Sequence, residues 1–350
     1  MKNQKRLRDY GIHIGKMKTG KLNAITDIAG IRVGHCTIDH EKAKTGVTVI
    51  LPCTDNIYKE KMMATCHVIN GFGKTTGSIQ IEELGTLETP IVLTNTLSVG
   101  VAEDALIEYM LDQNEDIGLT TGTVNPVVGE CNDGDLNHIR KRHIKKEHVL
   151  EAINNAQMEF EEGSIGAGRG MVCFELKGGI GSASRVVELD NKAYTLGALV
   201  LTNFGSKEDF VINGESIGKK IIGQEMESKD EAVEKGSIMV ILATDIPSSD
   251  RQLKRLAKRA SIGIARTGGQ TGHGSGEIVI AFSTANRVSH YKDGDISSFH
   301  MLHEDCIETV FRAVIESVEE AILNSMICAE TTKGRDEKIV YSLKEYRDLL

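Results

Sequence analysis

One serine lies where a solvated segment changes abruptly into buried chain. Residues 223–236 hold five acidic residues and two lysines, a composition typical of an exposed, mobile loop. Ser237 comes next, and six apolar residues without alternation follow it at 238–243, a pattern that predicts a strand covered on both faces. If the Gly236–Ser237 bond is cut, Ser237 carries a hydroxyl nucleophile and a free α-amine, with a pKa near ~7.7, to act as its base.

A glycine-rich segment at 268–277 contains the second group of residues that could do chemistry. Ser275 follows Ser237 by 38 residues, and Glu277 lies two residues further on. In an extended chain this alternation aims both side chains to the same side, and the glycines around them let backbone approach a substrate closely. From these residues alone, an ordinary loop serine before a strand and a surface glutamate in a glycine turn remain open.

Other motifs that could bind a ligand fail on their spacing. The segment 71–75 ends like a phosphate-binding loop but lacks that loop's first glycine. The segment 166–170 begins like a dinucleotide-binding loop, but Met171 stands where the third glycine belongs. His300 and His303 do not form a metal-binding H-E-x-x-H pattern, and the seven cysteines include no C-x-x-C pair. We therefore expect no metal and no cofactor.

The composition limits the partners of the chain. Its 41 basic and 50 acidic residues give a formal charge of −9, and only 15 of its 350 residues are Phe or Tyr, which argues against a nucleic acid partner. The N-terminus is basic but runs into no apolar stretch, and no apolar run approaches the ~20 residues of a membrane helix. We expect a cytoplasmic protein that does not interact with membranes.

Elements of two kinds must position these residues. Short apolar runs of strand length recur, each closed by glycine or a turn residue, and helical patterns lie between them. The expected strands cover 30–33, 45–51, 90–93, 171–174, 196–202 and 238–243, and the expected helices cover 100–113, 147–160, 249–266 and 304–329. The last helix is apolar on more than one stripe, so we expect it to be covered on several sides. This mixture predicts layered α and β structure.

Several long segments, in order along the chain, resemble the self-processing serine aminopeptidases of the L-aminopeptidase/D-esterase and β-peptidyl aminopeptidase family, peptidase family S58. The resemblance covers about residues 22–345. It includes the runs Ala-Thr-Asp-Ile-Pro at 243–247, Ser-Gly-Glu at 275–277 and Ala-Phe-Ser-Thr-Ala-Asn at 281–286. It also includes the segments 25–34, 163–168, 177–185, 252–266 and 329–335.

The resemblance implies a fold and a maturation step. The implied α+β fold is a four-layer α/β/β/α sandwich that resembles N-terminal nucleophile hydrolases with different connectivity, and that is shared with ornithine acetyltransferases. A polar leader at 1–22 would precede a single catalytic domain at 23–350. Cleavage between Gly236 and Ser237 would divide the chain into an α-subunit, 1–236, and a β-subunit, 237–350. The resemblance also implies a tetramer of such αβ units.

Four residues match the family's catalytic positions. Ser237 matches the nucleophile, and Ser275 and Glu277 match the serine and the acid that orient and tune it. Asn203, in Leu-Thr-Asn-Phe-Gly at 201–205, matches the asparagine that lines the oxyanion site, where one preorganised donor is typically worth ~10²–10³ in rate.

Two further residues are expected to bind substrate. Glu130 lies where the family has an acid that faces the free amine of the substrate, and a charge-assisted contact there selects a free N-terminus. Relatives tend to carry aromatic residues just after this acid, whereas this chain has Asn132 and Asp135. The lining of the amine pocket therefore differs from that of its relatives, and we expect Asn132 to contribute to it.

The function implied by these matches is hydrolysis of N-terminal amide or ester bonds, in short peptides or amino-acid amides, through an acyl-enzyme on Ser237. Two alternatives are open. One is an acyltransferase of the ornithine acetyltransferase type, although those enzymes have threonine at the cut. The other is an unprocessed homologue that only binds its ligand.

Glycine is over-represented, at 36 of 350 residues against a usual ~7%. Much of the excess lies at 163–181, at 236 and at 263–276, all within segments that carry the resemblance. We expect these glycines to provide the close backbone approach that a substrate cleft and a self-cleaving bond require.

Overall fold

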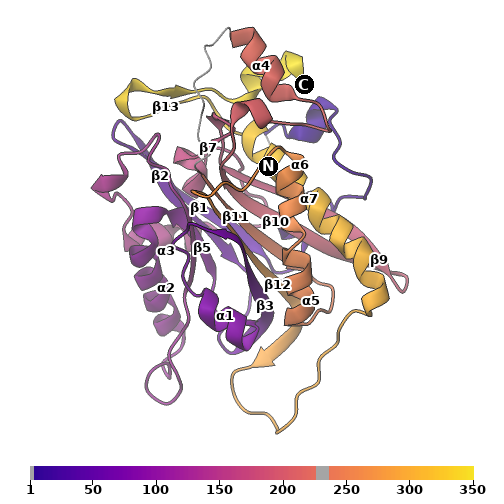
Figure 1. Ribbon diagram of the computed structural model, residues 1–350. Coiled ribbons are helices and arrows are strands. Elements are labelled where there is room, and N and C mark those ends of the chain that lie inside the picture. The colour runs from indigo at the N-terminus through magenta and orange to yellow at the C-terminus, as the bar shows by residue number, and fades with distance from the viewer. Residues whose placement is uncertain (1–3, 226–235) are drawn as a thin grey trace.

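The computed structural model describes residues 4–225 and 236–350 and arranges them in four layers (Figure 1). Two β-sheets stack face to face, and helices cover the outer face of each sheet. The predicted α/β/β/α sandwich is therefore confirmed. The acidic segment expected to be an exposed loop, 223–236, lies mostly outside the described residues.

The larger sheet brings three strand ends together at Ser237. Within the described residues its strand order is β4-β3-β12-β11-β10-β9. The central strands β11 and β12 are parallel, and the other neighbouring pairs are antiparallel. The register places Ser237 of β11 between Asn203 of β10 and Gly276 of β12. The strands are Glu60–Gly71 (β3), Thr86–Leu87 (β4), Ile180–Leu189 (β9), Lys192–Asn203 (β10), Ser237–Thr244 (β11) and Gly276–Ser289 (β12).

The smaller sheet supplies the wall opposite the larger one. Its order within the described residues is β1-β2-β5-β6, with β5 and β6 parallel. Apolar side chains from both sheets form the core between them, with Leu93, Met239 and Phe282 among the most buried. The strands are Arg32–His40 (β1), Ala43–Leu51 (β2), Ile91–Asn95 (β5) and Val127–Cys131 (β6).

Helices complete the two outer layers (Figure 1). On the smaller sheet, α2 and α3 bury residues such as Leu106 and Val149 against β2 and β5. On the larger sheet, α5, α6 and α7 bury residues such as Leu253 and Val318 against β9–β12. The helices are Ser78–Leu84 (α1), Val99–Gln113 (α2), Lys146–Asn154 (α3), Ile217–Glu225 (α4), Asp250–Ala257 (α5), Ala260–Arg266 (α6) and Ile307–Ile327 (α7).

Short elements connect these layers. The small strand pairs are β7 (Val172–Cys173) with β8 (Leu176–Lys177) and β13 (Thr332–Lys333) with β14 (Ile339–Val340). The 3₁₀ turns are Leu7–Tyr10, Ile25–Asp27, Thr96–Ser98, Ile139–Lys141, Gly166–Gly170, Lys207–Asp209, Glu304–Cys306, Arg335–Glu337 and Leu343–Leu349. Among the described helices, none is both long enough and apolar enough to cross a membrane.

Two of the predicted helices differ from the structure in their extent. The pattern at 249–266 divides into α5 and α6; the Ser249 hydroxyl caps α5 by accepting from the Gln252 N–H at 3.2 Å, as its position suggests. The pattern at 147–160 ends as a helix at Asn154. The chain then pairs with β1, because Gln157 and Val33 exchange two backbone hydrogen bonds of 3.0 Å.

The N-terminal segment is built into the fold. Leu7 and Ile14 are fully buried against the outer face of the larger sheet. The guanidinium of Arg8 forms an ion pair with Glu320 of α7, with Nε–Oε1 at 2.6 Å. Among the described residues of the expected leader, polar side chains such as Arg8 therefore bind buried partners in the domain.

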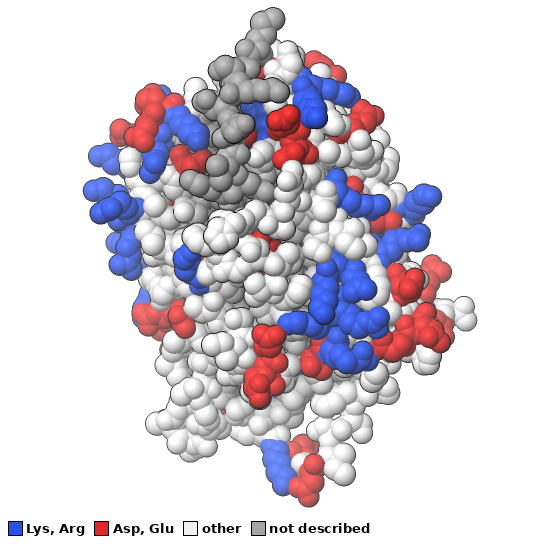
Figure 2. Space-filling view, viewed as in Figure 1, with Lys and Arg blue, Asp and Glu red and all other residues white. Residues whose placement is uncertain are grey.

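A basic patch on α5 and the turn after it has acidic neighbours. Figure 2 shows lysines and arginines gathered there, with acidic side chains at the edge. The Lys254 Nζ lies 2.8 Å from the Glu82 carboxylate. Arg255 pairs with Glu304, and the Arg259 guanidinium lies 3.7 Å from the centroid of the Phe311 ring. The patch is a solvated helix face rather than a field of unbalanced positive charge.

Candidate active site

Ser237 occupies the first position of β11, at the edge where three strands of the larger sheet begin or end. Asn203 is the last residue of β10 and Gly276 is the first of β12. The Ser237 residue is only 6% exposed, because both neighbouring strands flank it. The predicted change from solvated to buried chain at this residue is thus the start of a central strand.

The carbonyl of Gly236 is held from two sides. The Ser237 hydroxyl donates to the Gly236 oxygen at 2.6 Å, and the backbone N–H of Gly276 donates to the same oxygen at 3.1 Å. The Ser237 oxygen therefore lies next to the carbonyl that it would attack. The Gly276 N–H withdraws electron density from that carbonyl and stabilises a negative charge that develops on its oxygen.

Only glycine fits before Ser237. A Cβ at position 236 would lie 2.4 Å from the Asn203 carbonyl oxygen and 2.6 Å from the Phe204 Cα, and both are backbone atoms that cannot move aside. The glycine at 236 therefore gives the close backbone approach that we expected there.

The side chain of Asn203 is fixed at both ends. Its Oδ1 accepts from the backbone N–H of Val172 at 2.9 Å, and its Nδ2 donates to the backbone oxygen of Asn132 at 3.0 Å. An amide nitrogen carries two hydrogens, so one N–H of Asn203 remains beside the cavity that this residue lines. Asn203 can thus offer a donor near Ser237.

Ser275 and Glu277 lie next to Ser237 but do not line the cavity. The Ser275 hydroxyl donates to the Gly272 oxygen at 2.7 Å, and the Asn70 amide donates to the same oxygen at 3.1 Å. Glu277 is buried and pairs in register with Ile238, the residue after Ser237. The hydrogen bonds of Ser275 and Asn70 to Gly272 hold the chain just before β12, next to the Gly276 N–H.

A cavity of about 700 Å³ opens in front of Ser237. Glu130 lines it with both carboxylate oxygens held, one by the Lys74 backbone N–H at 2.9 Å and the other by the Thr96 hydroxyl. The predicted residues Asn203 and Asn132 line it as well. The structure therefore brings Ser237, Asn203, Glu130 and Asn132 to one cavity.

Asn132 is exposed, whereas the thiol of the preceding residue, Cys131, is buried. The Asn132 Oδ1 accepts from the Gly134 N–H at 2.9 Å. Cys131 is fully buried, and burial, with the nearby Glu130 carboxylate, raises the pKa of its thiol well above the usual value. This thiol is therefore protonated and does not compete with Ser237 as a nucleophile.

The family model of Peptidase family S58 matches residues 23–340, which is most of the chain. The chain belongs to peptidase family S58. This membership agrees with the resemblance inferred from the sequence and with a nucleophilic serine at the cavity.

Three relatives of this S58 peptidase have named functions or solved structures. The beta-peptidyl aminopeptidase BapA of Sphingosinicella microcystinivorans is 38% identical, over 94% of this chain and 87% of its own length. The PH0078 protein of Pyrococcus horikoshii OT3 has a TM-score of 0.93 and 51% identity, over 99% of this chain and 98% of its own. The L-aminopeptidase D-Ala-esterase/amidase of Ochrobactrum anthropi has a TM-score of 0.88 and 36% identity, over 99% of both chains.

These comparisons establish the class of enzyme. The Ochrobactrum protein is described as a prototype for the serine aminopeptidases and as a new variant among the Ntn hydrolase fold. This S58 peptidase is a serine aminopeptidase with that α+β fold. Of the alternatives left open by the residues, the family favours the hydrolase over the acyltransferase and over a homologue that only binds its ligand.

Several cavity residues of the S58 peptidase were missed by sequence reasoning. Phe72 and Lys74 follow β3, Phe204 follows Asn203, and Arg335 comes from the turn after β13. Phe72 is exposed, and the Lys74 Nζ lies 4.5 Å from the centroid of its ring. No local pattern marks these residues, because they reach the cavity only through contacts between distant segments.

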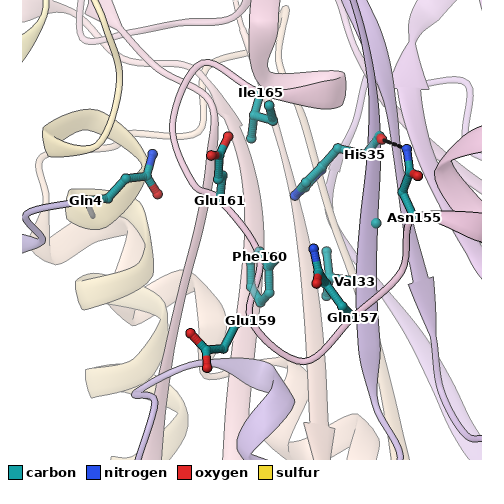
Figure 3. A pocket seen from close by; sticks show the side chains of 10 residues that line it. Gln4, Val33, His35, Asn155, Gln157, Glu159, Phe160, Glu161 and Ile165 are labelled. Carbon is teal, nitrogen blue, oxygen red and sulfur yellow. Dashed lines mark hydrogen bonds between the residues drawn. The ribbon is translucent and has the colours of Figure 1, made fainter. Parts of the chain in front are cut away.

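A second cavity of this S58 peptidase, of about 570 Å³, contains none of the predicted residues. Figure 3 shows the His35 ring directed into it from β1 and the Asn155 amide bonded to the His35 backbone. Desolvation lowers the pKa of His35 to about 4, so the ring is neutral at pH 7. The described residues that line this cavity include no serine, threonine or cysteine. Within the described part of the chain, no group of three metal-ligating side chains could hold an ion.

Proposed function

We propose that this aminopeptidase cuts its own Gly236–Ser237 bond and then uses Ser237, as a new N-terminal residue, to hydrolyse substrates. The observation that carries the proposal is the placement of the Ser237 hydroxyl 2.6 Å from the Gly236 oxygen, with the Gly276 N–H on that same oxygen. A nucleophile, its target carbonyl and a donor for the developing charge are thus assembled around one peptide bond.

Self-cleavage proceeds as an N-to-O acyl shift. The Ser237 Oγ attacks the Gly236 carbonyl carbon while the hydroxyl proton moves to the departing backbone nitrogen. The C–N bond breaks, and Gly236 becomes an ester on Ser237. Water then hydrolyses this ester, which leaves a Gly236 carboxylate, a free Ser237 hydroxyl and a free α-amine. The Gly276 N–H, which held the Gly236 oxygen, can then hold the carbonyl oxygen of a substrate.

The mature enzyme repeats this chemistry on a substrate. The α-amine of Ser237 accepts the hydroxyl proton as Oγ attacks the substrate carbonyl, and it returns the proton to the leaving amine. The oxyanion faces the Asn203 Nδ2–H and the Gly276 N–H. Water then hydrolyses the acyl-enzyme on Ser237 and releases the acid. Ser275 and Glu277, at the start of β12 next to the nucleophile, orient and tune Ser237.

The cavity determines which substrates fit. Its volume of about 700 Å³ suits a ligand the size of a short peptide or an amino-acid amide. The Glu130 carboxylate is positioned to bind the ammonium of a free N-terminus, and Asn132 lies at the exposed side of the same cavity. A tetramer of αβ units and a cytoplasmic location, both expected from the sequence, are part of this proposal.

Intact-mass spectrometry of the purified protein tests the proposal directly. We expect two chains of 236 and 114 residues, with the smaller mass matching Ser237–Leu350 without modification. Release of a chromophore from amino-acid p-nitroanilides should rise in proportion to the cleaved fraction. A protein that stays one chain after long incubation and releases no N-terminal residue would contradict the proposal.

The pH dependence identifies the base. We expect kcat/KM to rise as the pH passes through the pKa of a chain-terminal amine, near ~7.7, because only the neutral amine accepts the Ser237 proton. A competing explanation is Asp133, which is next to Asn132 and whose pKa burial raises to about 7. The rise of kcat/KM with pH should therefore persist in Asp133→Asn. Loss of this rise in that variant would assign it to Asp133 and not to the amine.

A further inference from the structure

Lys177 is a fully buried lysine close to the catalytic strand ends. Its Nζ donates to three backbone carbonyls, those of Gly168 at 3.0 Å, Met171 at 2.8 Å and Gly178 at 2.8 Å. Three acceptors match the three donors of an ammonium group. Burial, followed by the charge of Arg169, lowers the pKa of Lys177 well below its usual value, whereas the three carbonyl acceptors favour the charged ammonium form. Such a group is costly to bury, and the reaction proposed above does not use it.

One of these carbonyls belongs to the peptide group that holds Asn203. The carbonyl of Met171 and the N–H of Val172 are the two ends of a single planar trans peptide, since the described chain contains no cis bond. Lys177 binds the oxygen end. Val172 donates from the other end to the Asn203 Oδ1 at 2.9 Å. Fixing the carbonyl of this plane therefore fixes the direction of its N–H.

The direction of that N–H decides which end of the Asn203 amide faces the cavity. Because Val172 is a donor, it requires the Asn203 oxygen, and the Asn203 nitrogen must then face the Asn132 oxygen and the cavity. Without this constraint the amide could turn over and present an oxygen to a developing oxyanion. The positive charge of Lys177, next to the Met171 oxygen, also polarises this peptide group. The Val172 N–H therefore becomes a stronger donor, and its hydrogen bond to the Asn203 Oδ1 becomes stronger.

We propose that Lys177 is a positioning residue for the oxyanion donor, acting on Asn203 through the Met171–Val172 peptide. The proposal rests on the role given to Asn203 in the proposed function. We call this path, from Lys177 through the Met171–Val172 peptide to Asn203, the relay. Neighbouring hydrogen bonds keep it rigid. The Gly178 N–H donates to the Met171 oxygen at 3.1 Å, and the Phe174 N–H donates to the Phe204 oxygen at 2.7 Å. The short strands β7 and β8 thus attach the relay to the end of β10.

A double-mutant cycle tests this role, since a merely structural lysine would not be coupled to Asn203. The substitutions are Lys177→Met, which keeps the length of the side chain, and Asn203→Ala. The probe is an amino-acid p-nitroanilide, and kcat is expressed per cleaved chain counted by mass spectrometry. We expect Asn203→Ala to lower kcat by ~10²–10³-fold. Lys177→Met should lower it about tenfold, the usual effect of one charge-assisted hydrogen bond, with KM little changed.

The double variant gives the decisive result. We expect Lys177→Met to change kcat little when position 203 is already alanine, because the relay then has nothing to orient. An equal loss of kcat with and without the Asn203 side chain would overturn the proposal. Full activity of Asn203→Ala by itself would instead contradict the role of Asn203 in the proposed function, so the two failures are distinguishable.

Two further variants separate positioning from folding. Lys61, at the far end of β3, forms an ion pair with the nearly buried Glu88. Lys61→Met should therefore lower the thermal midpoint without lowering kcat per cleaved chain. If Lys177→Met does not fold, Lys177→Gln keeps two N–H donors without the charge, and the same cycle is measured with it. An additive cycle with Lys177→Gln would overturn the proposal equally.

Discussion

Purified Ser237→Ala is expected to remain a single chain of 38.2 kDa and to show no aminopeptidase activity. The substitution removes the oxygen that lies 2.6 Å from the Gly236 carbonyl oxygen, and with it the acyl shift that would create the α-amine. The loss of rate should be about 10⁴-fold or more, as for other enzymes that lose a serine nucleophile. Mass spectrometry and p-nitroanilide hydrolysis measure the two losses on one sample.

A matched serine separates this effect from a general effect of losing a hydroxyl. Ser261, on α6, donates to the Lys258 carbonyl on the helix surface. Ser261→Ala should be cleaved and active like the unmodified chain. If Ser237→Ala is still cut at position 236, or if turnover persists in the uncut chain, then another residue is the nucleophile and the proposed function is wrong.

The start of the central strand at Ser237 could be predicted because its signal is local. Ser237 lies at the junction between an acidic segment and six apolar residues, and the structure places the start of the central strand β11 at that residue. The apolar stripes of α7 also predicted its burial, since most of its residues from Ala313 onward are buried. In both places, neighbouring residues in sequence carry the whole pattern.

Strand β9 could not be predicted, because buried polar residues lie on both of its faces. Ser182, Ser184 and Arg185 are fully buried, and they bond to the N-terminal segment and to α7. A search for apolar periodicity passes over such a strand, since its polar groups are satisfied by segments more than 100 residues away in the chain. The relay from Lys177 to Asn203 is hidden for the same reason, because a backbone N–H and a carbonyl leave no mark in the sequence.

The expectation about the glycines was right at 236 and wrong at 163–181. In that segment the glycines allow close packing and do not line the cavity. A Cβ at Gly163 would lie 2.4 Å from the backbone of Cys328, and one at Gly181 would lie 2.0 Å from the Ala321 oxygen of α7. These two glycines let the chain pack against the last helix and its C-terminal end, a role that composition alone cannot distinguish from that of lining a substrate cleft.

The packing of α7 against the larger sheet depends on a buried cluster of charges. Arg185 of β9 is fully buried and forms ion pairs with Glu316 at 2.9 Å and with Glu320 at 2.7 Å. Arg8 binds the other oxygen of Glu320 at 2.6 Å. Burial alone would raise the pKa of Glu320, but Arg8 and Arg185 hold it below its usual value. Under the proposed cleavage, these contacts join the α-subunit to the β-subunit.

We therefore expect Arg185→Met to lower the free energy of unfolding by about 3–5 kcal/mol, because it leaves buried carboxylates without their main partner. Urea unfolding in the uncut Ser237→Ala chain measures the loss on one chain. A carboxylate with a depressed pKa stabilises the fold above its unfolded pKa of ~4.3, and this contribution disappears as the pH falls through its folded pKa. The difference in free energy of unfolding between the Ser237→Ala chain with and without Arg185→Met should therefore narrow in acid.

The exposed pair Lys292–Asp295 provides the control, since Lys292→Met should leave the urea midpoint unchanged. Equal midpoints for Arg185→Met and Lys292→Met would show that the buried cluster does not stabilise the packing of α7.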